Sequence, residues 1–132
     1  MDAWATALTA GLRPHLPEGI TLSVRGTVMS LRRNAAFQPP EGNGSASVLR
    51  YDLQEILGPE ASTAAARRAA VWVLHSLQTE ISEWLGRRWP PFASATTPDA
   101  ASSTTWTTDE RTVIGYRSPS GWSLEIAACP DL

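Results

Sequence analysis

The longest regular pattern of apolar and polar positions lies between residues 58 and 89, where apolar side chains recur at helical spacing. It predicts a helix from about Pro59 to Leu85, since proline suits the first helical position. Ser62 offers a later, competing start, because serine is a favourable N-cap. Gly86 can adopt the left-handed conformation that ends a helix. The stripe predicted to face the core consists of Ala66, Ala70, Val73, Leu74, Leu77, Ile81, Trp84 and Leu85.

The opposite side of this helix is polar apart from one tryptophan. Arg68, His75, Thr79 and Ser82 lie there together with Trp72. Arg68 precedes Trp72 by about one helical turn, so its guanidinium can stack on the indole ring. Two explanations of Trp72 are open. Either the chain's own loops cover the ring as a second packed layer, or the ring contacts a partner.

Shorter patterns precede the long helix. Helical spacing predicts a first, short helix over residues 2–12. Residues 20–32 alternate in a strand-like way, with a change of phase after Gly26 that fits one bent strand or a short hairpin. Residues 46–53 predict another strand, with a helix over residues 52–57 as the alternative.

Three strands are predicted near the end of the sequence. Ser118-Pro119-Ser120-Gly121 has proline second and glycine fourth, which is typical of a type I turn between two of them. The register expected from this turn places Gly115 opposite Leu124, which leaves room for the indole of Trp122 to lie across the strand. The predicted strands are Thr104 to Thr108, Thr112 to Arg117 and Trp122 to Ala127.

This order of elements predicts an α+β fold with a mostly antiparallel sheet, a short N-terminal helix and one long central helix. A length of 132 residues and a hydrophobic fraction of 42% suit a single domain over residues 1–132. Two segments rich in proline and small or polar residues are predicted to be flexible loops, at about 33–46 and 90–103.

Charge and composition argue against a nucleic-acid-binding protein, a disulfide-bonded protein and a membrane protein. The net charge is −2 and the 11 basic residues, all arginine, are scattered, whereas a nucleic-acid binder usually carries a basic stripe. The single Cys129 allows no internal disulfide, which suits a reducing compartment. No segment reaches the ~18 apolar residues of a membrane span, and the first residues do not resemble a signal peptide. We expect neither nucleic acid nor membrane as a partner, and a cytoplasmic location, or the virion after assembly.

Residues that could support catalysis do not form a recognisable pattern. His75 has no metal-binding partner four residues away on either side. Asp109 and Glu110 are adjacent in a turn, so their side chains diverge. Residues 42–45 are glycine-rich, but the lysine of a phosphate-binding loop does not follow them. We therefore expect no catalytic residues, no cofactor and no bound metal.

The stretch from Leu85 to Phe92, LGRRWPPF, brings two arginines and two aromatic residues together at the predicted helix end. One explanation is structural, because Arg87 and Arg88 would favour the negative end of the helix dipole. The other is a binding edge, since tryptophan and arginine often anchor interfaces. The candidate partner-binding residues are Arg68, Trp72, Arg87, Arg88, Trp89 and Phe92.

A helix with Gln78, Ile81 and Glu83 runs into Trp89-Pro90, followed by a polar linker and a hairpin around Gly115-Tyr116. In this C-terminal half the chain resembles small uncharacterised proteins of actinobacteria and their phages. The resemblance implies an accessory or virion-associated protein and carries over no active-site residues. The order of elements is also similar to that of phage head–tail connector and tail-terminator proteins.

The leading functional hypothesis is a non-enzymatic protein–protein interaction or assembly component, for example a phage or phage-derived structural protein. Its partner would be another protein or further copies of the chain. The hypothesis depends on the six tryptophans and the lack of a catalytic pattern. Two alternatives stay open: a small-ligand or enzyme-like pocket between helix and sheet, and a cytoplasmic chaperone or adaptor for a secreted protein.

Overall fold

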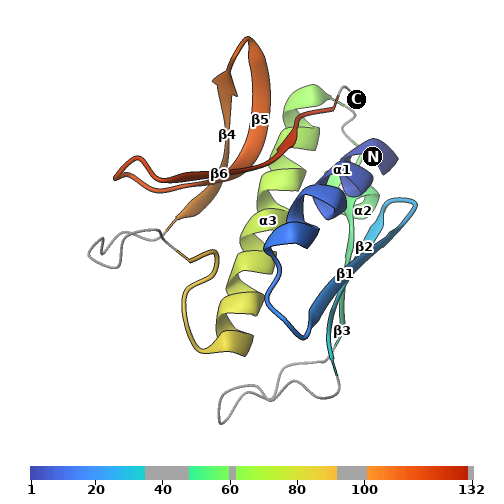
Figure 1. Cartoon of the computed structure of the whole chain (residues 1–132). Coiled ribbons are helices and arrows are strands. Elements are labelled where there is room, and N and C mark those ends of the chain that lie inside the picture. The colour runs from blue at the N-terminus through green and yellow to red at the C-terminus, as the bar shows by residue number, and fades with distance from the viewer. Residues whose placement is uncertain (35–47, 60–61, 92–100, 131–132) are drawn as a thin grey trace.

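The computed structural model describes residues 1–34, 48–59, 62–91 and 101–130. The chain has the α+β fold that the sequence predicts, with a long central helix. The strands form two three-stranded antiparallel sheets, in the orders β1-β2-β3 and β4-β5-β6, where one sheet was expected (Figure 1). The loops predicted at 33–46 and 90–103 fall mostly outside the described residues.

The first sheet follows the N-terminal helix. Helix α1 (Asp2–Leu12) leads through a short 3-10 turn (Arg13–His15) into β1 (Ile20–Arg25), β2 (Val28–Arg33) and β3 (Val48–Asp52). Strands β1 and β2 form a hairpin, so the change of phase after Gly26 marks a turn. Gly26 itself has a φ of 62°, which a side chain would disfavour.

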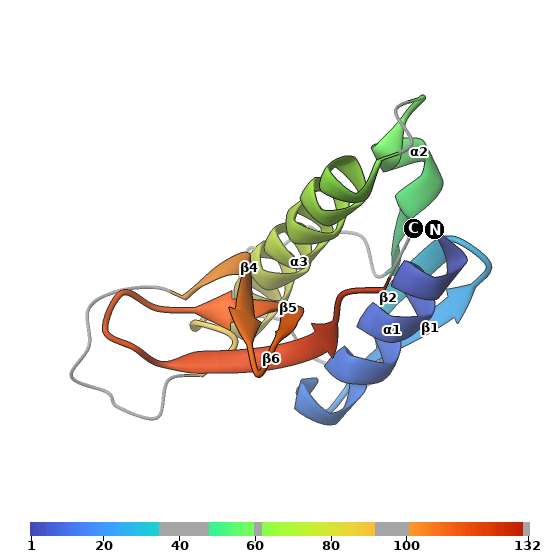
Figure 2. The same ribbon diagram turned by 90° about the horizontal axis from the view of Figure 1, so that it is seen from above.

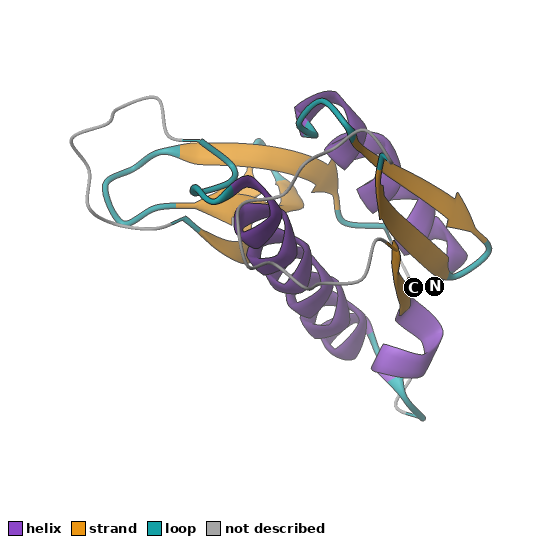
Figure 3. Cartoon of the chain, turned by 90° about the horizontal axis from the view of Figure 1, so that it is seen from below, coloured by secondary structure: helices purple, strands orange, loops and turns teal. Residues whose placement is uncertain are grey.

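Two helices follow β3, as Figure 3 shows. The Asp52 carboxylate accepts the Gln54 N–H and begins the short α2 (Leu53–Leu57), so both the strand and the alternative helix are present. Helix α3 covers Thr63–Leu85. The predicted start at Pro59 is therefore wrong and the competing start is right, because the Ser62 hydroxyl caps the Ala65 N–H.

The second sheet consists of β4 (Ser102–Thr108), β5 (Arg111–Arg117) and β6 (Ser123–Ala128). The predicted register is wrong by one residue, because Arg117 pairs with Ser123 and Gly115 with Glu125, and a bulge separates this part of the pairing from that of Ile114. The physical reason for Gly115 also differs from the expected one. A side chain there would meet the Leu124 carbonyl and the ring of Trp106 rather than that of Trp122.

Helix α3 lies beside both sheets (Figures 1 and 2). Its predicted stripe belongs to the apolar core. Towards the second sheet, the hydroxyl of the buried Tyr116 donates a 2.7 Å hydrogen bond to the Leu74 carbonyl. Towards the first sheet, the Arg33 guanidinium lies 5.5 Å from the ring centre of Trp84. The stripe residues are all buried except Leu85, which is half-buried.

The N-terminal helix joins the two halves of the core. Its buried side chains belong to the same apolar cluster as those of α3, and Figure 2 shows α1 beside β6. The approach is so close that a side chain on Gly11 would run into the Ile126 carbonyl. Glycine is therefore required here for packing rather than for its backbone angles.

Candidate functional site

Trp72 lies on the outer face of α3. Its side chain is 51% exposed, and among the described parts of the chain it is the one large apolar side chain that is mostly in solvent. Val73 and Leu74 are fully buried, because consecutive helical positions turn by about 100°. The ring meets Tyr51 of β3 edge to face, with 6.4 Å between ring centres.

Two hollows flank the Trp72 ring. The first, of about 500 Å³, lies between α3 and β4, and we call it the Trp72 groove. The second, of about 390 Å³, is lined by Tyr51, Asp52 and Glu55 on the side of β3 and α2. The Trp72 groove is lined by Arg67, Arg68, Val71, Trp72, His75, Ser102, Ser103 and Thr105.

The Trp72 groove has a positive wall. Arg67 and Arg68 line it, and none of the described residues that line it is a carboxylate. The Nε atom of Arg67 is buried and has no hydrogen-bond partner among the described residues. The Arg67 side chain also interacts with the thiol of Cys129. Burial raises the pKa of the Cys129 thiol, and the positive charge of Arg67 partly opposes that rise.

Strand β4 forms the opposite wall of the groove. The Ser103 hydroxyl donates a 2.8 Å hydrogen bond to the Val71 carbonyl, which fixes the strand beside α3. Among the described strands, β4 pairs with β5 alone and is therefore an edge strand. Its sequence, SSTTWTT, contains neither a charge nor a proline, the usual features that protect an edge.

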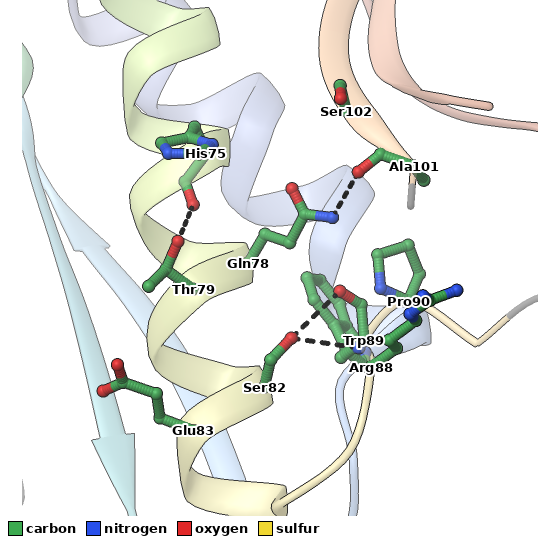
Figure 4. Close-up of a pocket in the computed structure, with 10 residues that line it drawn as sticks. All are labelled: His75, Gln78, Thr79, Ser82, Glu83, Arg88, Trp89, Pro90, Ala101 and Ser102. Carbon is green, nitrogen blue, oxygen red and sulfur yellow. Dashed lines mark hydrogen bonds between the residues drawn. The ribbon is translucent and has the colours of Figure 1, made fainter. Parts of the chain in front are cut away.

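Trp89 does not belong to this surface. It is 3% exposed, its Nε1 donates a 3.0 Å hydrogen bond to the His15 carbonyl, and its ring meets Tyr116 edge to face. Its backbone N–H donates to the Ser82 hydroxyl (Figure 4). The expectation that the Trp89 ring is open to a partner is therefore wrong, because the chain turns back after Gly86 and packs the ring into its own core.

The other candidates at the helix end are separate from Trp72. Arg87 and Arg88 are exposed and line a small hollow of about 170 Å³. They follow the end of α3 at Leu85, which lies about 20 Å along the helix axis from Trp72 at ~1.5 Å per residue. Phe92 is outside the described residues. The structure thus brings Arg68 and Trp72 together and leaves Arg87 and Arg88 at a distance.

A further cavity of about 390 Å³ lies between α3 and the segment around Trp89 and Pro90 (Figure 4). Several of its polar groups are used by the fold. Gln78 donates a 2.6 Å hydrogen bond to the Ala101 carbonyl, and Ser82 bonds the Trp89 backbone. Over the described ranges, no three His, Cys, Asp or Glu side chains are grouped closely enough to hold a metal ion.

Sequence reasoning missed several residues of the Trp72 groove. Ser102 and Ser103 were assigned to a linker, although their run into Thr104 and Thr105 has the β-branched character of a strand. Tyr51 was assigned correctly to a strand, but its contact with Trp72 has no local signal. Arg67 lies beside the candidate Arg68, and only the placement of β4 shows that it lines the same groove.

No helix in the described part of the chain has the length and apolar character needed to cross a membrane. The chain was compared with family models, with curated proteins and with solved structures. None of the three comparisons found a match.

Proposed function

We propose that this protein is a non-enzymatic binding or assembly component, whose protein partner docks on the outer face of α3 at Trp72. The observation that carries the proposal is the 51% exposure of this ring on a regular helix. Covering on the order of 100 Å² of exposed indole would contribute about 2–3 kcal/mol to an association.

The surroundings of Trp72 support the same conclusion. Tryptophan and arginine are the residues that most often anchor interfaces, and Arg67 and Arg68 stand one turn before the ring. The hollows on both sides of Trp72 can accommodate side chains of a partner. A flat surface with one exposed tryptophan would lack this complementarity.

The biological form of this binding is a further part of the proposal. A phage or phage-derived structural protein, working in the cytoplasm or in a virion, would bind its neighbour through such a face. A cytoplasmic chaperone or adaptor would use the same face. A small-ligand protein would instead use the cavity in Figure 4, but Gln78 and Ser82 are engaged in hydrogen bonds within the fold.

The test places a photo-crosslinking amino acid on α3 in cells that naturally express the protein. Trp72→p-benzoylphenylalanine should give a defined cross-linked partner or dimer, and Thr6→p-benzoylphenylalanine, exposed on α1, should not. With the identified partner purified, Trp72→Ala should weaken binding at least tenfold while the melting temperature stays within a few degrees. Unchanged binding contradicts the proposal, and so does a greatly destabilised monomer, which would assign the ring to the core.

A further inference from the structure

We propose that two copies of this chain associate through the outer face of α3, with the two helices antiparallel about a two-fold axis near His75 and Ser76. The Trp72 ring of each copy inserts into the cavity of Figure 4 on the other copy, which we call the Thr79 cavity. This inference rests on the proposed function and specifies the partner. Two features support it: a projecting ring and a cavity lie on one face, and the charge changes sign along that face.

The outer face of α3 is open along most of the helix. Exposed side chains recur there every three or four residues, which places them on one side of the helix. A second helix can therefore lie along this stripe at the usual 8–10 Å between helix axes. The exposed residues of the stripe are Ala64, Arg68, Trp72, His75, Thr79 and Glu83.

The stripe carries both a projection and a depression. Trp72 projects from it, with 51% of its side chain exposed. The Thr79 cavity opens about two turns further along the helix (Figure 4). His75 lines both this cavity and the Trp72 groove, so the ring and the cavity adjoin on one side of α3. The cavity measures about 390 Å³, within the ~300–1,000 Å³ of pockets that hold small organic groups.

The polar groups of the Thr79 cavity tolerate an aromatic ring. Gln78 donates a hydrogen bond to the Ala101 carbonyl, and Ser82 bonds the backbone of the segment that follows the helix. The Thr79 hydroxyl donates a 3.1 Å hydrogen bond to the His75 carbonyl. An indole that covers these three side chains therefore leaves none of these hydrogen bonds unmade.

A two-fold axis matches each ring to a cavity. In a symmetric dimer both copies use the same surface, so every contact is made twice. Antiparallel pairing of α3 with its axis between His75 and Ser76 places Trp72 opposite Thr79 of the second copy. One operation thus covers both rings and fills both cavities. Parallel pairing would place the two Trp72 rings against each other and leave both cavities empty.

Charge along the stripe favours the same antiparallel direction. Arg68 lies in the first half of α3 and Glu83 in the second half. Antiparallel pairing places each Arg68 opposite Glu83 of the second copy, whereas parallel pairing opposes like charges. Arg68 also interacts within its own chain, and its five N–H donors can serve more than one acceptor. Arg88 lines the Thr79 cavity as well, but it follows the helix end and lies towards the uncharged first turn of the second helix, Thr63–Ala66.

The length of the contact indicates a reversible dimer. Arg68 and Glu83 are about 22 Å apart along the helix axis, at ~1.5 Å per residue. Small interfaces of this kind form transient complexes. We therefore expect an equilibrium between monomer and dimer that shifts with protein concentration.

Sedimentation equilibrium of the full chain over a range of concentrations measures the dissociation constant of the dimer. Trp72→Ala removes the ring and Thr79→Phe fills the cavity, and each should raise this constant at least tenfold. Both side chains are exposed in the single chain, so circular dichroism should show an unchanged fold. The control is Arg25→Glu, exposed on β1 and absent from the lining of either hollow, which should leave the constant unchanged.

Charge reversal tests the direction of the helices. Arg68→Glu alone and Glu83→Arg alone should each weaken the dimer at least tenfold, because like charges then meet at both symmetric contacts. An equimolar mixture of these two variants should restore dimers, since each contact again joins an arginine to a glutamate. The chain that carries both substitutions should also dimerise like the wild type. A variant that merely destabilises the fold would not give this restoration.

The outcomes separate this inference from the proposed function. A chain that stays monomeric up to ~1 mM, where even a weak dimer is populated, overturns the inference. A dimer that Trp72→Ala leaves unchanged, or that the mixture of charge variants does not restore, overturns it too. In those cases the proposed function still stands if the cross-link at position 72 identifies a different protein whose binding Trp72→Ala abolishes. If that binding persists in Trp72→Ala, both are wrong.

Discussion

At the scale of single residues, Leu77 and Ile81 lie at the centre of the core. Leu77 is 1% exposed and Ile81 is 0% exposed, so truncating either to alanine removes buried methyl groups and leaves a cavity. We expect each substitution to lower the free energy of unfolding by about 2–5 kcal/mol. Urea denaturation measures the change, and Thr79→Ala on the exposed side of α3 should stay within about 0.5 kcal/mol. A loss that small for Leu77 or Ile81 would contradict the assigned face.

The two tryptophans among the residues predicted to bind a partner, Trp72 and Trp89, show how much can be predicted for single residues. Helical spacing alone places Trp72 outside the stripe, because its neighbours Val73 and Leu74 define the buried side. Trp89 lies after the end of α3, so the helical period does not predict which way its side chain points. Its burial depends on the His15 carbonyl and the Tyr116 ring, which are distant in the sequence. Its neighbours in the sequence are arginines and prolines, which are mostly exposed in proteins, so the sequence suggested that Trp89 is exposed too.

At the scale of elements, the turn between β4 and β5 carries backbone strain. Asp109 and Glu110 both have positive φ angles, 48° and 63°, as a two-residue hairpin turn of type I′ requires. Glycine is preferred at such positions, since a side chain there meets the neighbouring carbonyl. The sequence predicts a turn here, but it cannot predict this conformation, which the pairing of Thr108 with Arg111 imposes.

Relief of this strain is measurable. Glu110→Gly should raise the free energy of unfolding by about 0.5–1 kcal/mol, because the relaxed backbone offsets the greater freedom of glycine in the unfolded chain. Chemical denaturation gives the value. The matched control is Ser120→Gly in the β5–β6 turn, where the serine does not have a positive φ and no gain is expected. A loss of stability at position 110 would contradict the assigned turn.

Element boundaries were predictable where a cap or a period marks them. Ser62 and Gly86 carry the signals of helix ends, and the structure uses both. The division into two sheets was not predictable, because the periodicity of a strand says which face is buried but not which strand it pairs with. The register of Gly115 likewise follows from the pairing of Arg117 with Ser123 beside the turn, and the bulge between Ile114 and Gly115 has no local sequence signal.

At the scale of the whole molecule, the response to alkaline pH reports on the contact between α3 and the sheets. Burial raises the pKa of Tyr51 to about 12, with the charge of Glu80 adding to the effect. Burial also raises the pKa of Tyr116, and more strongly. Both groups favour the neutral form in the folded state, and the absence of lysine leaves few other groups that titrate in this range.

The sign of the pH dependence follows from these shifts. Below the unfolded pKa of ~10 both tyrosines are neutral in either state, and their contribution is fully present. As the pH rises from about 10 towards the folded pKa values, only the unfolded chain releases protons, so stability falls. Urea unfolding between pH 8 and 11 should show this fall, and Tyr116→Phe should make it shallower. A stability that stays constant up to pH 11 would contradict the burial of both rings.

The contact between Gly11 and Ile126 has a consequence for protein synthesis. Helix α1 precedes every described strand in the chain, whereas β6 is translated only after the other described strands. The Trp4 and Leu8 side chains are fully buried in the folded protein. In the nascent chain their apolar surface stays exposed to solvent until β6 has been made. The core therefore stays incomplete from the synthesis of α1 until β6 has been translated, a period in which a chaperone at the tunnel exit has a defined segment to shield.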